Sequence, residues 1–270
     1  MEKESIKRMD TFNNGYTALS EIGGKNGDML MDYGVLSLKK GQEWTDRTEL
    51  EKAYLLVQGE VEFCWDGEVR RVSRSDCFNE LPYVLHLPKS KEGTIRCISD
   101  NAEITVSRTE NERDFAPKFY EPGMYEDEYR GKGLMGETST RIVREVFGYK
   151  TAPYSKMVLG EVIGFPGKWS SYPPHHHHQP EIYYYKTLPE NGFGFCDLGD
   201  EVLKVTNNDT VFIRDGQIHP HVTAPGYALW YLWVIRHLDD DPYITPTFVD
   251  EHKWVTEPNA HIWQGPKQGK

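Results

Sequence analysis

The 270-residue chain has little positive charge and no basic run. Its 31 lysines and arginines face 42 aspartates and glutamates, which gives a formal net charge of -11 at pH 7. Nucleic acids and anionic membrane surfaces are bound through clusters of lysine and arginine that neutralise phosphates. The composition therefore excludes nucleic acid and membrane as expected partners and favours solubility.

Cysteine and long apolar segments are also scarce. The four cysteines, at positions 64, 77, 97 and 196, form no close CxxC pair, and this spacing excludes a zinc ribbon or a thioredoxin-type site. The opening residues, MEKESIKRMDTFNN, lack the apolar stretch of a secretory signal. No window approaches the roughly 18 apolar residues of a membrane span. We therefore expect a cytoplasmic protein with reduced thiols.

Long amphipathic helical patterns are missing, and short runs of β-branched and aromatic residues take their place. Gly, Asp, Asn and Pro separate these runs, which fall into clusters at residues 30–110 and 155–237. Such regular spacing is typical of an all-β sandwich or barrel. The charged stretch between the clusters, which contains Gly and Pro, is typical of a connection. The sequence thus predicts a duplicated β-barrel.

Metal-ligating residue types concentrate in one segment, WSSYPPHHHHQPEIYYY at residues 169–185. If a strand begins near His175, side chains two apart share a face, which places His175, His177 and Glu181 together. A later run, VFIRDGQIHPH at residues 211–221, adds His219 after a turn. Three imidazoles and a carboxylate are the ligands of a divalent metal site. We expect one such ion, with zinc favoured and manganese or iron also compatible.

Other interpretations of these residues stay open. Four consecutive histidines could form a solvated tract, and in the alternate register His176 and His178 would be the ligands. Tyr184, Trp230 and Trp233 are expected to pack in a core or an interface rather than contact substrate. The only histidine of the first half, His86, lies between apolar residues, so we expect the first barrel to carry no metal.

Several blocks resemble the 5-deoxyglucuronate isomerases, the bicupins of inositol catabolism, and more distantly the ketol-isomerases of pectin-derived deoxy-uronates. The second half carries GEVIGFPGKWSSYPPH, EIYYYK and HPHVTAPGYALWYLWV, and the first half carries VLSLKKGQ, ELPYVLHLP and AEITVSR. The resemblance implies a bicupin of two tandem jelly-roll barrels. A degenerate cupin barrel with the connection would occupy residues 1–145, and a metal-binding cupin barrel residues 146–270. It also implies that His175, His177, Glu181 and His219 hold the metal.

The implied activity is metal-dependent aldose–ketose isomerisation of a sugar acid. The expected reaction converts 5-deoxy-D-glucuronate to 5-dehydro-2-deoxy-D-gluconate, by proton transfer through an enediolate or by a hydride shift. The linker His178–Gln179–Pro180 is shorter than in that family, and Arg214–Ile218 also departs from it, so another uronate could be the substrate. A cupin dioxygenase and a non-catalytic sugar- or metal-binding cupin are the alternatives.

Candidates for the remaining roles follow from position. Tyr183 and His221 are the candidate proton carriers, because one shares the predicted face of Glu181 and the other lies two residues past His219. Tyr185 shares that face as well and is a candidate substrate contact. The carboxylate of a uronate is best bound by a positively charged fork, and the candidates for it are Arg144, Arg214 and Lys168.

The strand expected at Ala228–Arg236 is apolar on both faces. Such a strand is either central in a sandwich or covered by a partner. Together with the tryptophan-bearing tail, this pattern predicts a homo-oligomer.

Overall fold

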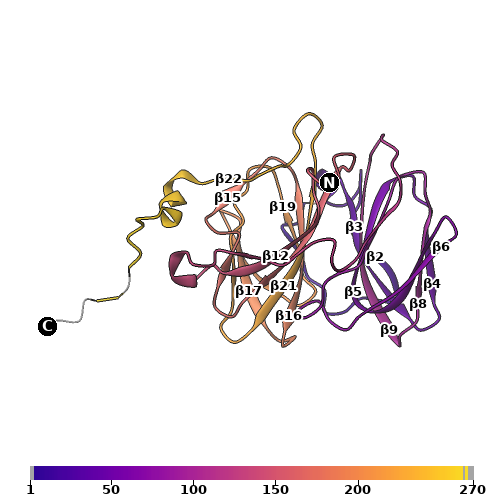
Figure 1. The fold of residues 1–270 in the computed structure, drawn as a ribbon, viewed down its shortest axis with the longest axis horizontal. Coiled ribbons are helices and arrows are strands. Elements are labelled where there is room, and N and C mark those ends of the chain that lie inside the picture. The colour runs from indigo at the N-terminus through magenta and orange to yellow at the C-terminus, as the bar shows by residue number, and fades with distance from the viewer. Residues whose placement is uncertain (1–2, 264, 267–270) are drawn as a thin grey trace.

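The computed structural model describes residues 3–263 and 265–266, and strands dominate them (Figure 1). The helical elements are short 3₁₀ segments: η1 (Gly27–Met29), η2 (Met135–Glu137) and η3 (Asp250–Thr256). No helix in this part of the chain is long and apolar enough to cross a membrane. The expected all-β class is confirmed.

The first barrel is built on a large antiparallel sheet of order β10-β7-β5-β9-β3-β2. The long strand β5 bends away from this sheet, and its second half pairs with β6 and β8, while β8 pairs with β4. The strands are β2 (Gly15–Ser20), β3 (Asp32–Lys39), β4 (Glu43–Asp46), β5 (Glu51–Trp65), β6 (Glu68–Arg74), β7 (Val84–Leu87), β8 (Gly93–Cys97), β9 (Asn101–Thr109) and β10 (Lys118–Tyr120).

The second barrel repeats this plan with a sheet of order β1-β19-β16-β21-β13-β12-β11, opposite a smaller sheet of order β14-β20-β17-β18. A short pair, β15 with β22, closes one end. The strands are β1 (Ile6–Lys7), β11 (Glu128–Arg130), β12 (Arg141–Phe147), β13 (Met157–Gly164), β14 (Trp169–Ser170), β15 (His175–His176), β16 (Glu181–Leu188), β17 (Phe193–Asp197), β18 (Val202–Thr206), β19 (Thr210–Ile213), β20 (His221–Thr223), β21 (Ala228–Arg236) and β22 (Thr247–Phe248).

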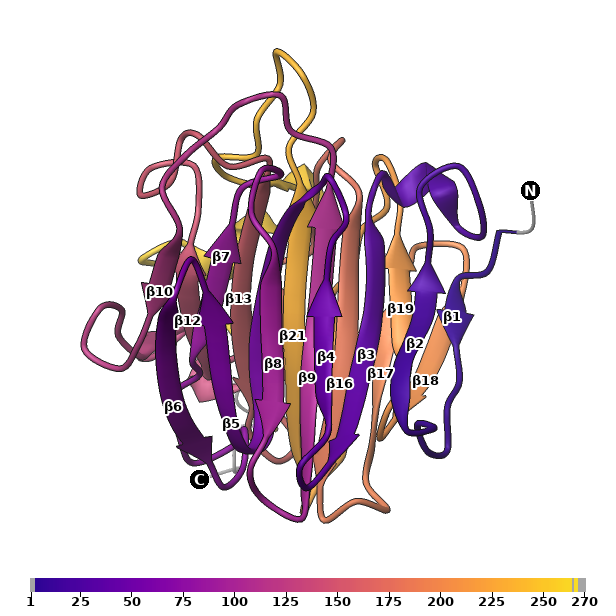
Figure 2. The same ribbon diagram turned by 90° about the vertical axis from the view of Figure 1, so that its right-hand side faces the viewer.

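The chain crosses between the barrels at its start. Strand β1 precedes the whole first barrel, yet it pairs with β19, Ile6 opposite Val211, and Figure 2 shows it beside β2 and β18 at one edge of the molecule. The expected division at residue 145 lies inside β12, which pairs with β13 along its length. That division stays a prediction, and any cut there would break a strand of the second barrel.

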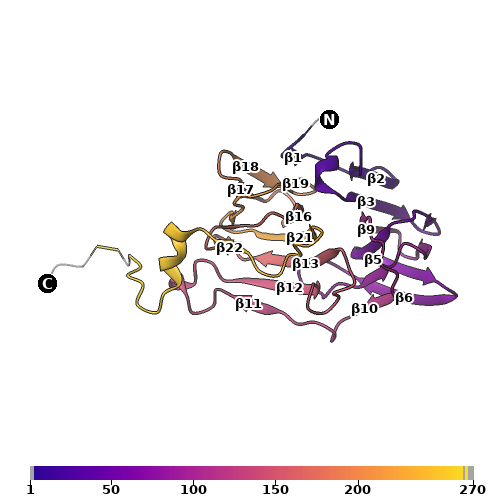
Figure 3. The ribbon, with the colours of Figure 1, turned by 90° about the horizontal axis from the view of Figure 1, so that it is seen from above.

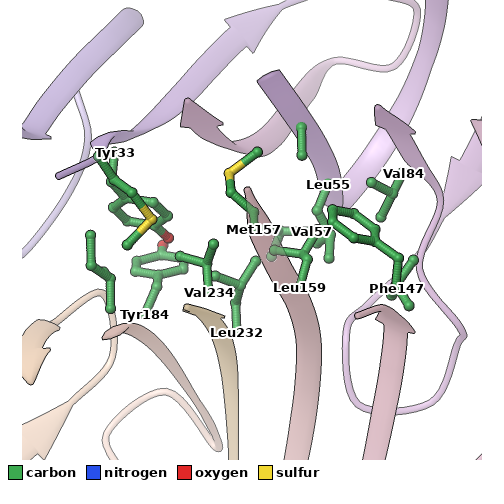
Figure 4. Close-up of a cluster of buried hydrophobic side chains, with 14 of the residues drawn as sticks. Tyr33, Leu55, Val57, Val84, Phe147, Met157, Leu159, Tyr184, Leu232 and Val234 are labelled. Atoms are coloured by element: carbon green, nitrogen blue, oxygen red, sulfur yellow. The ribbon is translucent and has the colours of Figure 1, made fainter. Parts of the chain in front are cut away.

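The two large sheets pack face to face, and an apolar core fills the space between them (Figures 3 and 4). Val35, Leu55 and Val57 of the first sheet meet Leu159 and Leu232 of the second, all at most 1% exposed. Burial of such apolar surface is the main term that stabilises a fold.

Strand β21 contributes to this core on one face only. Trp230, Leu232 and Val234 point into it, whereas Tyr231 and Trp233 point into the interior of the second barrel. Both faces of the strand are therefore covered within one chain. The packing of the two sheets therefore accounts for the two apolar faces of β21 without a partner chain. The homo-oligomer stays a prediction.

Buried ionic groups cross the same layer. The Arg74 guanidinium forms two bonds to the Glu161 carboxylate, at 2.7 and 3.0 Å, and both side chains are fully buried. Arg144 adds a contact of 3.3 Å to Glu161 and bonds Asp127 at 2.6 Å. His86 is also buried here, 2.7 Å from Glu51 and stacked on Phe147. These groups tie the barrels together.

Candidate metal centre

The histidine segment folds as a broken strand. β15 holds only His175 and His176, residues 177–180 form a turn, and β16 begins at Glu181. A strand does begin at His175, but it does not continue to Glu181, so the alternation of side chains along one strand does not extend across the segment. Pro180 has no N–H to donate to a strand ladder, and its carbonyl accepts the N–H of Arg236 instead.

Three of the four expected ligands meet inside the second barrel. One ligand atom from each of His177, Glu181 and His219 lies within 4.8 Å of the others, and all three residues are buried. The Glu181 Oε2 atom is 3.1 Å from the Nε2 of His177 and 3.4 Å from that of His219. The turn places His177, β16 places Glu181, and the segment between β19 and β20 places His219.

Backbone carbonyls orient both imidazoles. The Nδ1–H of His177 donates to the Gln179 carbonyl at 2.8 Å, and that of His219 donates to the Gln217 carbonyl at 3.0 Å. A carbonyl only accepts, so Nδ1 carries the proton and Nε2 is left to face Glu181. This arrangement is the usual outer support of metal-binding histidines.

The buried polar atoms fit a divalent cation. The Nε2 of His219 has no hydrogen-bond partner, and burial lowers the pKa of this imidazole well below 6.5, which keeps it neutral. A neutral lone pair therefore faces a carboxylate oxygen, and two acceptors at that distance are stabilised by a cation between them. The nitrogen and oxygen donors suit zinc, manganese or iron. The group could hold a metal.

His175, the fourth expected ligand, lies beside this group. Its ring centroid is 4.7 Å from that of His219, nearly perpendicular to it, and its Nδ1 donates to the Pro173 carbonyl at 3.2 Å. Burial lowers its pKa to about 4. Metal binding by His175 stays a prediction, and so does metal binding by His176 and His178, the ligands of the alternate register. His178 is exposed and bonds Asp215, and His176 pairs with Thr247 in β22.

The group opens into a pocket of about 210 Å³. One wall is the segment after β21, where Tyr243 contacts His177 with ring centroids 4.9 Å apart, and Phe248 of β22 contacts His175 at 5.7 Å. The remaining lining residues are Arg130, Arg141, Val143, Val162, Ser170, Ser171, Tyr183, Trp233, Ile235 and Pro246.

Of the two candidate proton carriers, only Tyr183 lines the pocket. Its ring contacts His219 at 5.9 Å, and burial, with the Glu181 charge, raises its pKa well above 10. His221 lies deeper: its Nδ1–H donates to the His219 carbonyl, its Nε2 bonds the Tyr185 hydroxyl, and burial lowers its pKa to about 3. Both of its nitrogens are engaged, and Tyr185 lies with it behind the pocket.

The expected carboxylate-binding residues lie elsewhere. Arg144 is held between the barrels by Glu161 and Asp127. Arg214 is paired with Asp28, and Lys168 lies over the Phe165 ring. None of these three cations lines the pocket.

The pocket has instead two arginines that the sequence reasoning missed. Arg141 begins β12, and Arg130 is its partner across the β11–β12 ladder. In RIVREVF, Arg141 and Arg144 are three residues apart and so point to opposite faces of the strand. Tyr243 was missed as well, since no sequence signal shows that the segment after β21 returns to cover the histidines.

Comparison with known proteins agrees with this geometry. The model of the KduI/IolB family matches residues 6–255. A protein of Geobacillus thermodenitrificans named 5-deoxy-glucuronate isomerase is 27% identical over 249 residues, which are 83% of this chain and 86% of that protein. One of the same name from Lacticaseibacillus casei is 24% identical over 93% and 97% of the two chains.

Solved structures agree on the fold. An IolB-like protein from Salmonella typhimurium superposes with a TM-score of 0.83 at 22% identity, over 93% of this chain and 99% of that one. Oxalate decarboxylase of Bacillus subtilis superposes with a TM-score of 0.64 at 9% identity, over 95% and 82% of the chains. The expected bicupin architecture is thus confirmed. The family match spans both barrels and includes His177, Glu181 and His219, and the chain belongs to the KduI/IolB family.

Proposed function

We propose that the protein is a metal-dependent aldose–ketose isomerase that converts 5-deoxy-D-glucuronate to 5-dehydro-2-deoxy-D-gluconate. The observation that carries this proposal is the buried His177–Glu181–His219 group facing a small pocket. The names of the relatives, at about a quarter identity, support the substrate.

In this proposal His177, Glu181 and His219 hold one divalent ion, with His175 within reach as a further ligand. Bound there, zinc, or alternatively manganese or iron, supplies a Lewis acid that polarises a carbonyl oxygen. The chain supplies the rest. The backbone carbonyls of Gln179 and Gln217 accept the Nδ1–H of His177 and His219, and so orient the Nε2 atoms of both rings towards the metal position.

Isomerisation moves hydrogen between C1 and C2 of the sugar, so a group at the pocket wall must hold a proton. Tyr183 is the candidate, because its ring contacts His219 and the residue lines the pocket. Its raised pKa makes the hydroxyl a proton donor rather than a base at neutral pH. In the free protein Tyr183 therefore starts protonated. It would give its proton to the C1 oxygen as negative charge develops there and take one back from the C2 hydroxyl, while the hydrogen on C2 passes to C1.

The test is turnover followed by NMR, with the metal-loaded protein, 5-deoxy-D-glucuronate and related uronates. Replacing His219 by Ala should abolish turnover and stoichiometric metal binding, because the group then keeps only the His177 imidazole and the Glu181 carboxylate. Replacing the exposed His178 by Ala is the matched control and should change neither.

Two outcomes would contradict the proposal. Failure to isomerise any deoxy- or keto-uronate with metal fully bound, together with oxygen consumption by the iron form, would indicate a dioxygenase. Full metal retention in the His219 variant would mean that a different set of residues binds it.

A further inference from the structure

Arg141 is half-buried at the pocket and differs in its partners from the fully buried arginines. Its Nη1 donates to the carbonyls of Ser139, at 3.0 Å, and Tyr172, at 3.5 Å. Its Nε is buried without a hydrogen-bond partner, and no carboxylate of the described residues forms an ion pair with it or is among the charges that act on it. The guanidinium nonetheless lines the pocket that holds the His177–Glu181–His219 group.

Elsewhere in the molecule buried guanidinium groups are satisfied. Arg74, Arg108 and Arg144 each pair with a carboxylate at 2.6 or 2.7 Å. Arg236 lacks such a pair, but its three nitrogens donate to the Thr109 hydroxyl and to backbone carbonyls, and it does not line the pocket. Among the described residues that line the pocket, Arg141 is thus the cation with a buried donor that has no partner.

This arrangement has an energetic consequence. A guanidinium removed from water without a counter-charge is costly, and burial lowers the pKa of Arg141. An anion in the pocket would offset that cost, and the planar fork of an arginine matches a carboxylate through two parallel hydrogen bonds.

We propose that Arg141 binds the carboxylate of the sugar acid and so determines specificity for acids over neutral sugars. The inference rests on the proposed function, because it assumes that the sugar end reaches the metal group at the other side of the same pocket. Arg130 lies beside it on β11 but is exposed and paired with Glu128. Arg130 therefore attracts the carboxylate through its charge at longer range, and it does not form the two parallel hydrogen bonds.

The experiment compares binding of D-glucuronate, D-glucose and D-glucose 6-phosphate to the metal-loaded protein by calorimetry. The wild type should prefer D-glucuronate to D-glucose. Arg141→Gln should weaken D-glucuronate binding by about 10- to 150-fold, the value of a charge-assisted hydrogen bond, without changing D-glucose binding or metal stoichiometry. Arg141→Lys should recover only part of the loss, because an ammonium cannot form the fork.

Arg130→Gln is the matched control. Its effect should be smaller and should vanish in 1 M salt, where the screening length is about 3 Å, whereas the effect of Arg141→Gln should persist. Equal binding of both sugars by the wild type, or of D-glucuronate by wild type and Arg141→Gln, would overturn the inference. Tighter binding of the phosphate ester would point to a phosphate site and overturn it too.

The two proposals fail separately. If the wild type isomerises no uronate but discriminates D-glucuronate through Arg141, the proposed function fails and the inference holds. If Arg141→Gln keeps the kcat/KM of the wild type for the uronate, the inference fails and the isomerase stands.

Discussion

Replacing Glu161 by Gln tests whether the buried ion pair joins the barrels. Glu161 accepts two hydrogen bonds from Arg74 and a longer one from Arg144, and it is fully buried. A glutamine of the same shape keeps one acceptor but sets an amide N–H against a guanidinium N–H. The Arg74 charge then keeps only carbonyl partners, those of Leu56, Glu80 and Cys77 at 2.9, 2.8 and 3.4 Å.

The expected loss follows from this geometry. Breaking a buried pair by removing one charge costs about 3–5 kcal/mol, out of a typical total of about 5–15 kcal/mol. At roughly 2–4 °C per kcal/mol for a chain of this size, the melting temperature should fall by on the order of 10 °C. Methionine at both Glu161 and Arg74 should restore most of the loss, because the guanidinium that stays buried there, that of Arg144, keeps its pair with Asp127.

The measurement is urea unfolding of the metal-free protein, with Glu60→Gln as control. Glu60 pairs with Arg71 at the same 2.7 Å, but on the surface, so its replacement should leave the unfolding midpoint unchanged. Equal midpoints for the Glu161 and Glu60 variants would refute the reasoning, because burial would then make no difference.

Further predictions concern the site and the assembly. Tyr183→Phe should keep stoichiometric metal, measured by mass spectrometry of the native protein, and lose about 10²- to 10⁴-fold in kcat if its hydroxyl transfers a proton. Burial lowers the pKa of His237 to about 4, whereas the unfolded chain takes up this proton near pH 6.5. His237 should therefore lower the unfolding free energy by about 1.4 kcal/mol per pH unit from pH 6.5 towards 4, in addition to the contributions of His175 and His221 in that range, and should add no slope above pH 7. His237→Asn should reduce the measured slope by that share. Sedimentation at micromolar concentration should give a mass above the 31.2 kDa of one chain, and a mass of one chain would end the oligomer prediction.

The sequence predicted the strand runs because each alternates short β-branched or aromatic segments with turn residues. It also predicted His177, Glu181 and His219, since few other residue types bind metals. It did not predict which face of β12 is inward. Each face of RIVREVF carries an arginine beside apolar residues, because one face lies in the barrel, with Val143, and the other between the barrels, with Ile142 and Val146. The alternation therefore could not separate Arg141 from Arg144.

The pairing of strand β1 with β19 could not be predicted from the sequence for a different reason. The strand is two residues long, Ile6–Lys7, and carries no pattern of its own. Its partner lies more than 200 residues later, at Val211 and Thr210, and only the assembled second barrel gives it an edge to join.

That pairing sets an order on folding during synthesis. At about 5–20 residues per second, the ribosome needs roughly 10–40 s after making Ile6 to reach Val211. The first barrel can fold in this interval, but the apolar face that includes Val35 and Leu55 has nothing to cover it until β13, β16 and β21 emerge. The nascent chain thus carries an exposed sheet face for much of its translation, which makes it a substrate for chaperones at that stage.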